Sequence, residues 1–111
     1  MLWFKKKNKE IFEDGNKFLK RYAGQINSLI DYVDQNEKVS DALDRLKEAY
    51  VFAVAPKVMN KEVKQYRENI EKMFNELREV LRSREWDEND VLFRIADLKS
   101  ELGMLTSVNK K

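Results

Sequence analysis

The 111-residue sequence contains no cysteine and no histidine, and it has only three glycines and one proline. Without cysteine it can form no disulfide or thiolate metal site, and without histidine it lacks the commonest general base and metal ligand. An all-β domain needs many turn residues, so the scarcity of glycine and proline favours an all-α protein. The longest apolar run, residues 49–55, is far shorter than the roughly 20 residues of a transmembrane helix.

Charged and apolar residues dominate what is present, at 38% and 42% of the sequence. An aromatic content of 11% argues against disorder, and the length suits one domain over residues 1–111. The net charge of +2 is distributed with alternating sign, since residues 1–24, 25–55, 56–86 and 87–111 carry +4, −3, +2 and −1. This alternation favours packing between successive helices. No apolar segment follows the basic N-terminal cluster, so we see no signal peptide and expect a cytoplasmic location.

The clearest pattern lies in residues 60–85, where apolar side chains recur at steps of three and four, as on one face of a helix. They are Val63, Tyr66, Ile70, Met73, Phe74, Leu77, Val80 and Leu81. Similar periodicity predicts helices over residues 8–34, 40–55, 61–85 and 87–102. The sequence therefore predicts an all-α protein, a single four-helix up-and-down antiparallel bundle with two long and two shorter helices. Residues 1–7 and 106–111 are expected to be loose tails.

Short polar residues and one proline mark the expected helix ends. Ser40, Asn60 and Asp87 are expected to cap the amino ends of the second, third and fourth helices. Pro56 should end the second helix, and Gly103 should end the fourth in a left-handed conformation. Residues 50–55 also resemble a strand, but a lone strand would have no partner in this sequence.

Trp86 lies just before the Asp87 cap, and Val91 lies four residues after it. This is the spacing of a hydrophobic staple, in which two apolar residues pack across a helix start. Trp86 is therefore expected to be a structural residue rather than a platform for a ligand. Val51, Phe52 and Phe93 fall on the outward faces of their helices.

Acidic clusters occur along the chain, but they fall on outward faces or at helix caps. A di-metal bundle would need inward carboxylates and Glu-x-x-His pairs, and neither is predicted. No calcium loop, glycine-rich phosphate loop or activated nucleophile is found. We therefore expect no catalytic, cofactor-binding or metal-binding residue, and no enzyme activity.

Residues 56–86, which include the third predicted helix, contain eight basic residues, and this raises the alternative of a weak nucleic-acid binder acting through that helix. Six glutamates are interleaved with these basic residues. A DNA-binding helix usually presents an unbroken basic face, so we expect a solvated, salt-bridged surface and no nucleic acid as partner.

The N-terminal segment suggests a second alternative. Trp3 and Phe4 precede Lys5, Lys6 and Lys7, and this order suits a peripheral contact with an anionic membrane surface. A disordered tail, or an aromatic plug folded onto the bundle, would give the same pattern.

Unequal helix lengths favour a third role. If the second helix returns antiparallel from residue 40, its end lies near Phe18, and the earlier residues Ile11, Phe12 and Gly15 project beyond it. Glycine on this apolar face indicates either a close approach of another backbone or drift at a frayed helix start. Trp3 and Phe4 project further, and an exposed strip of this kind is usually covered.

Three covers are possible for this strip: another copy of the chain, a different protein or lipid surface, or the C-terminal Met104, Leu105 and Val108. Our main hypothesis is a small non-catalytic helical module for protein–protein interaction that self-associates, as a homodimer, through the N-terminal half of its first helix. The partner-binding residues would be Trp3, Phe4, Ile11, Phe12 and Gly15.

Overall fold

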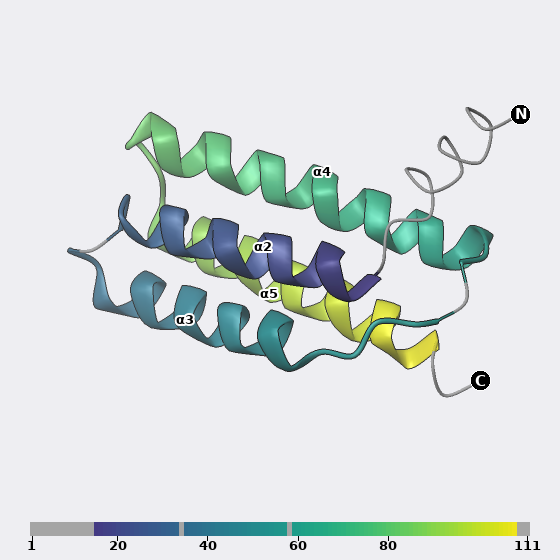
Figure 1. The fold of residues 1–111 in the computed structure, drawn as a ribbon. Coiled ribbons are helices and arrows are strands. Elements are labelled where there is room, and N and C mark those ends of the chain that lie inside the picture. Colours follow the sequence, from purple (N-terminus) through teal and green to yellow (C-terminus); the bar gives the residue numbers. More distant parts are fainter. Residues whose placement is uncertain (1–14, 34, 58, 109–111) are drawn as a thin grey trace, which may run out of the picture.

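The computed structural model describes residues 15–33, 35–57 and 59–108, and within these ranges it contains four α-helices and no strand. The helices are α2 (Gly15–Ile30), α3 (Glu37–Phe52), α4 (Lys61–Ser83) and α5 (Glu88–Ser107). They run alternately up and down along one axis (Figure 1). The all-α four-helix fold that the periodicity predicts is thus confirmed. The start expected for the first helix, at residue 8, lies outside the described residues.

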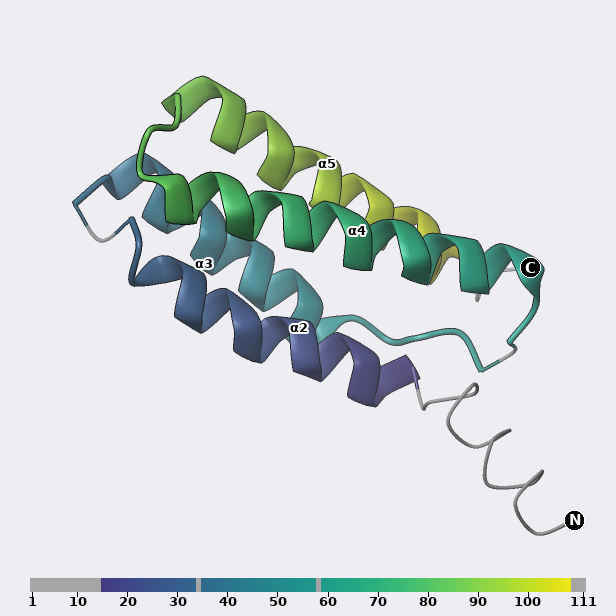
Figure 2. The same cartoon turned by 90° about the horizontal axis from the view of Figure 1, so that it is seen from above.

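The bundle consists of two antiparallel hairpins, α2 with α3 and α4 with α5, joined mainly through α3 and α5 (Figure 2). The expected packing of successive helices is therefore found within each hairpin. It is not found between the hairpins, because α3 packs mainly against α5 and not against the next helix, α4. Because successive helices alternate in direction, α3 and α5 run the same way, and the connection from α3 to α4 crosses one end of the bundle.

All four helices contribute one apolar face to the core, in which no charged side chain is buried among the described residues. The buried residues of α4 are Val63, Ile70, Phe74, Leu77 and Leu81. Tyr66, Met73 and Val80 of the predicted stripe are only half-buried. The stripe is therefore correct, but its centre is turned toward Phe74 and Leu81.

Two of the three predicted N-caps are confirmed. The Asn60 side chain accepts from the backbone N–H of Val63 at 2.9 Å, and Asp87 accepts from Asp90 N–H at 3.0 Å. The prediction of Ser40 as a cap is wrong. Asn36 Oδ1 accepts from Val39 N–H at 3.1 Å, so α3 begins at Glu37, and Val39 in its first turn is fully buried. The preceding turn, residues 31–36, therefore lies earlier in the chain than expected.

The carboxyl ends also differ from expectation. The fourth helix does not end at residue 102, because Gly103 has no positive φ and α5 continues to Ser107. This extra turn keeps Leu105 in the core, where it is 1% exposed. Thr106 and Ser107, which we expected in the tail, form this last turn.

The second helix ends at Phe52 rather than at residue 55, since Ala53 is extended. Val54, which follows this end, is 63% exposed. The first helix ends at Ile30 rather than at residue 34, and the third at Ser83 rather than at residue 85, followed by Arg84 in a left-handed conformation.

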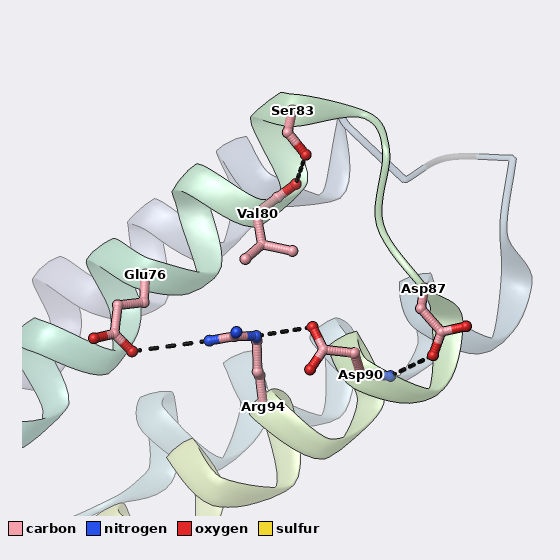
Figure 3. Close-up of polar contacts among 6 residues, drawn as sticks. All are labelled: Glu76, Val80, Ser83, Asp87, Asp90 and Arg94. Carbon is pink, nitrogen blue, oxygen red and sulfur yellow. Dashed lines mark hydrogen bonds and ion pairs between the residues drawn. The ribbon is translucent and has the colours of Figure 1, made fainter.

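The α4–α5 hairpin is fastened by polar contacts near its turn (Figure 3). Arg94 of α5 lies between two carboxylates, 3.0 Å from Asp90 and 3.8 Å from Glu76 on α4. Trp86 is half-buried and packs against the core, as expected for a structural residue. Exposed ion pairs of this kind contribute little energy each, so the buried apolar faces hold the hairpin together.

Candidate interaction surface

An apolar groove runs between the C-terminal halves of α3 and α5. It is lined by Ala49, Phe52, Ala53, Val54, Lys99, Leu102, Gly103 and Thr106. Small residues contribute to both of its sides: Ala49 of α3, Ala53 just after α3, and Gly103 of α5. A Cβ atom added at Gly103 would meet nothing within 4 Å. Gly103 is also exposed, so the groove is a depression open to solvent rather than an enclosed cavity.

Exposed apolar side chains gather beside this groove. The structure describes five exposed large hydrophobic residues: Phe52 (80%), Phe93 (66%), Val54 (63%), Met104 (50%) and Val51 (48%). Val51, Phe52 and Phe93 were expected to point outward, and this is confirmed. All of the five except Phe93 lie in or just after the last turn of α3 or α5. Exposed apolar surface is thus concentrated at one end of the bundle, where such clustering marks an interaction site more often than scattered residues do.

The same end receives the start of α2. A Cβ atom added at Gly15 would lie 2.5 Å from the Cβ of Ala55, and the Ala55 N–H donates to Asn16 Oδ1 at 3.2 Å. The close approach considered at Gly15 is therefore confirmed. The neighbour is the chain's own α3–α4 connection, so Gly15 is covered from within rather than standing free for a partner.

The other residues that we expected at a functional surface lie outside the described part of the chain. They are Trp3, Phe4, Lys5, Lys6, Lys7, Ile11 and Phe12. Their attachment point is nevertheless defined, because the described chain begins at Gly15, against Ala55.

A row of carboxylates leads away from the groove along α3. Asp41, Asp44 and Glu48 are all exposed, and they fall on the outward face that ends at Phe52. No ion pair involves any of the three in the described chain. The groove is therefore lined mainly by apolar residues, and a row of exposed carboxylates leads to it along α3.

Several basic side chains of α4 are engaged within the bundle. The Arg67 guanidinium lies 4.4 Å from the centre of the Phe18 ring. Arg78 donates to Gln25 of α2 and to Asn75, and Arg82 lies 3.9 Å from Glu79. The interleaved pattern of this helix thus corresponds to partnered rather than freely projecting arginines at these positions.

Tyr50 has an unusual environment in the core. Its side chain is fully buried, and its hydroxyl has no hydrogen-bond partner. Burial raises the pKa of Tyr50 well above its ordinary value of 10.0, and the nearby Tyr22 and Glu101 act in the same direction. The phenol therefore stays neutral at physiological pH, with one uncompensated polar atom in the core.

The opposite end of the bundle carries a polar hollow, lined by Asp31, Tyr32, Val33, Gln35, Asn36, Arg84, Trp86 and Glu88. There the Asn36 Nδ2 group donates to Glu88 Oε1 at 3.0 Å, which links the start of α3 to the start of α5. These residues belong to the α2–α3 and α4–α5 turns or flank them, so we interpret the hollow as part of the two turns rather than as a binding site.

Most of the groove could not be recognised from the sequence, because Gly103 was expected to end the fourth helix. The available signal was Leu105, because a buried residue three positions after Leu102 continues the α5 stripe past Gly103.

Within the described residues no group of three acidic, histidine or cysteine side chains is placed to hold a metal ion. None of the helices described is long and apolar enough to cross a membrane. Comparison of the chain with protein-family models, with curated proteins and with solved structures finds no match.

Proposed function

We propose that this chain is a small non-catalytic helical interaction module that associates with a second copy of itself. Its attaching element is the N-terminal half of the first helix with the residues before it, in particular Trp3, Phe4, Ile11 and Phe12. The observation that carries the proposal is the cluster of exposed apolar residues at the end of the bundle where this element joins.

Two features support this function. Phe52, Val54 and Met104 are between 50% and 80% exposed and lie in or just after the last turns of α3 and α5, and such exposure is costly for a chain that remains alone in water. The attaching element, which precedes Gly15, is rich in apolar residues: its sequence has two aromatic residues followed by a predicted apolar helix face. Self-association would remove both surfaces from water at once.

The test is the mass of the protein in solution. Sedimentation over a wide concentration range should show a monomer–dimer equilibrium, and the melting temperature should rise with protein concentration. Phe12→Glu should give a folded monomer, because a charge replaces an apolar contact at the interface.

Phe93→Glu provides the matched control, since Phe93 is an exposed phenylalanine away from this end of the bundle. It should leave the dimer intact. A wild-type chain that stays monomeric at every concentration would refute self-association. A Phe12→Glu variant that keeps the wild-type mass would refute the proposed surface.

A further inference from the structure

We propose that the groove between α3 and α5 is the receptor for residues 3–7 of a second copy of the chain. In this arrangement Trp3 and Phe4 enter the groove, and Lys5, Lys6 and Lys7 lie along the acidic row on α3. The inference rests on the proposed self-association and identifies the surface that receives the attaching element.

The groove suits aromatic side chains. Its described lining is apolar except for Thr106 and Lys99, and lysine presents a long aliphatic stem to such a surface. Phe52 and Val54 stand at its mouth with most of their surface exposed, so an incoming ring would find apolar walls. Each buried aromatic side chain removes about 150–250 Å² of surface from water, and two rings would therefore cover a patch of this kind.

The spacing of charges matches as well. Along α3, Glu48 precedes Phe52 by about 6 Å and Asp44 by about 12 Å, at 1.5 Å per helical residue. In an extended segment, Lys5 to Lys7 follow Phe4 by about 3–10 Å. When Phe4 lies beside Phe52, the three ammonium groups can therefore approach Glu48 and Asp44. Both carboxylates are exposed and free of ion pairs among the residues that the structure describes.

The proposed self-association favours a second copy over the chain's own groove as the place where this segment binds. Reciprocal exchange between two copies would place each segment in the other's groove and close a two-fold dimer.

The decisive experiment uses spin labelling, which the absence of cysteine makes specific to one introduced site. One sample of the protein, at natural isotopic abundance, carries a nitroxide on Leu2→Cys. It is mixed with ¹⁵N-labelled protein of wild-type sequence. We expect amide signals of Ala49, Ala53 and Gly103 in the ¹⁵N chains to broaden, because only contacts between copies are detected. A nitroxide on Gln35→Cys, at the opposite end, is the control and should leave these signals sharp.

Broadening at another surface, or broadening of the groove only when label and ¹⁵N share one chain, would overturn the receptor assignment. The second result would mean that the segment folds back onto its own bundle.

A pair of glycine variants tests the groove without disturbing the fold. Gly103→Arg and Gly24→Arg place the same side chain on two exposed helical sites, each with nothing within 4 Å of an added Cβ. Gly103→Arg should weaken dimerisation at least about tenfold, a change of 1.4 kcal/mol, by filling the groove and repelling the lysines. Gly24→Arg should leave it unchanged.

Charge reversal tests the acidic row. Glu48→Lys should weaken dimerisation about fivefold, and more at low salt, whereas Glu68→Lys on α4 should have no such effect. A stable wild-type dimer that tolerates both Gly103→Arg and Glu48→Lys would refute the receptor surface alone. A wild-type monomer would instead refute the proposed function.

Discussion

The two ends of the bundle are built differently. At one end, short turns join α2 to α3 and α4 to α5, and polar side chains satisfy the exposed backbone groups. Asn36 both caps α3 and donates to Glu88 at 3.0 Å, while Asp87 caps α5. At the other end a longer connection crosses from α3 to α4, and the flanking Phe52 and Val54 are left 80% and 63% exposed.

This difference teaches how an apolar surface can arise from connectivity. A tight turn brings two helix ends together, so capping side chains reach their targets across it. A crossing connection must leave the helix early to reach its destination, and α3 accordingly stops at Phe52 while apolar residues continue. The polar end is complete within one chain, whereas the crossing end has surface available for a partner.

A core substitution in the middle of the bundle should have the largest effect on the free energy of unfolding, and the substitutions at the two ends are compared with it. Leu77→Ala should lower the free energy of unfolding by about 2–5 kcal/mol, because Leu77 is fully buried and alanine would leave a cavity. Chemical denaturation measures the change. Phe93→Ala, at a 66% exposed site, is the control and should cost under about 0.5 kcal/mol. A similarly small loss for Leu77→Ala would contradict the packing of α4.

Gly15→Ala should break the crossing end. The new methyl group would lie 2.5 Å from the Cβ of Ala55, so the connection must shift, at a cost of about 1–3 kcal/mol. Gly24→Ala has no neighbour within 4 Å and should instead stabilise the chain by up to about 1 kcal/mol through helix propensity. Thermal denaturation of the two variants should therefore shift in opposite directions. Equal stabilisation by both would show that Ala55 does not pack on α2.

At the polar end, Asn36→Ala should cost about 1–2 kcal/mol, because it removes the α3 cap and the bond to Glu88 together. Asn36→Asp separates these roles, since its carboxylate still accepts from Val39 N–H but donates nothing to Glu88. It should therefore retain the cap, but its carboxylate would lie beside that of Glu88, so the two variants are compared at high salt, where this repulsion is screened. Identical denaturation midpoints under those conditions would mean that the cap contributes nothing.

Tyr50→Phe should give the smallest change in the free energy of unfolding, and it should raise that free energy, whereas Leu77→Ala, Gly15→Ala and Asn36→Ala should lower it. Removing an unpartnered buried hydroxyl should stabilise the fold by about 1 kcal/mol at neutral pH. The pKa of Tyr50 is raised in the folded state above its ordinary 10.0, so wild-type stability should fall as the pH rises above 10, where the unfolded chain ionises first.

Denaturation of Tyr50→Phe as a function of pH should lose part of this alkaline decline. Tyr66→Phe, whose hydroxyl donates to Glu62 at 3.4 Å, is the control and should keep it. An unchanged alkaline profile in Tyr50→Phe would indicate that its hydroxyl reaches water.

Local signals predicted much of this structure. The apolar periodicity of α4 and the caps at Asn60 and Asp87 depend on residues within a few positions of each other, and they were correct. The errors occurred where distant contacts decide the outcome. Gly103 continues a helix because Leu105 packs into the core, and α3 ends early because Ala55 must reach Gly15 and Asn16.

The groove could not be predicted for the same reason, because it depends on α3 pairing with α5. Alternating charge favours successive neighbours and says nothing about two helices separated by a third. The expected partner-binding residues other than Gly15 lie outside the described chain, and their role remains a prediction.

The parallel course of α3 and α5 has an electrostatic consequence. Both helices point their carboxyl ends toward the same end of the bundle, with α3 ending short of α5, and neither has a basic residue in its last turn (Figure 1). Each carboxyl end carries backbone partial charge equivalent to about −0.5 of an elementary charge. The amino ends of α2 and α4 lie at this end as well, with about +0.5 each, so the four helix dipoles largely cancel and the side chains decide which charges a partner meets there.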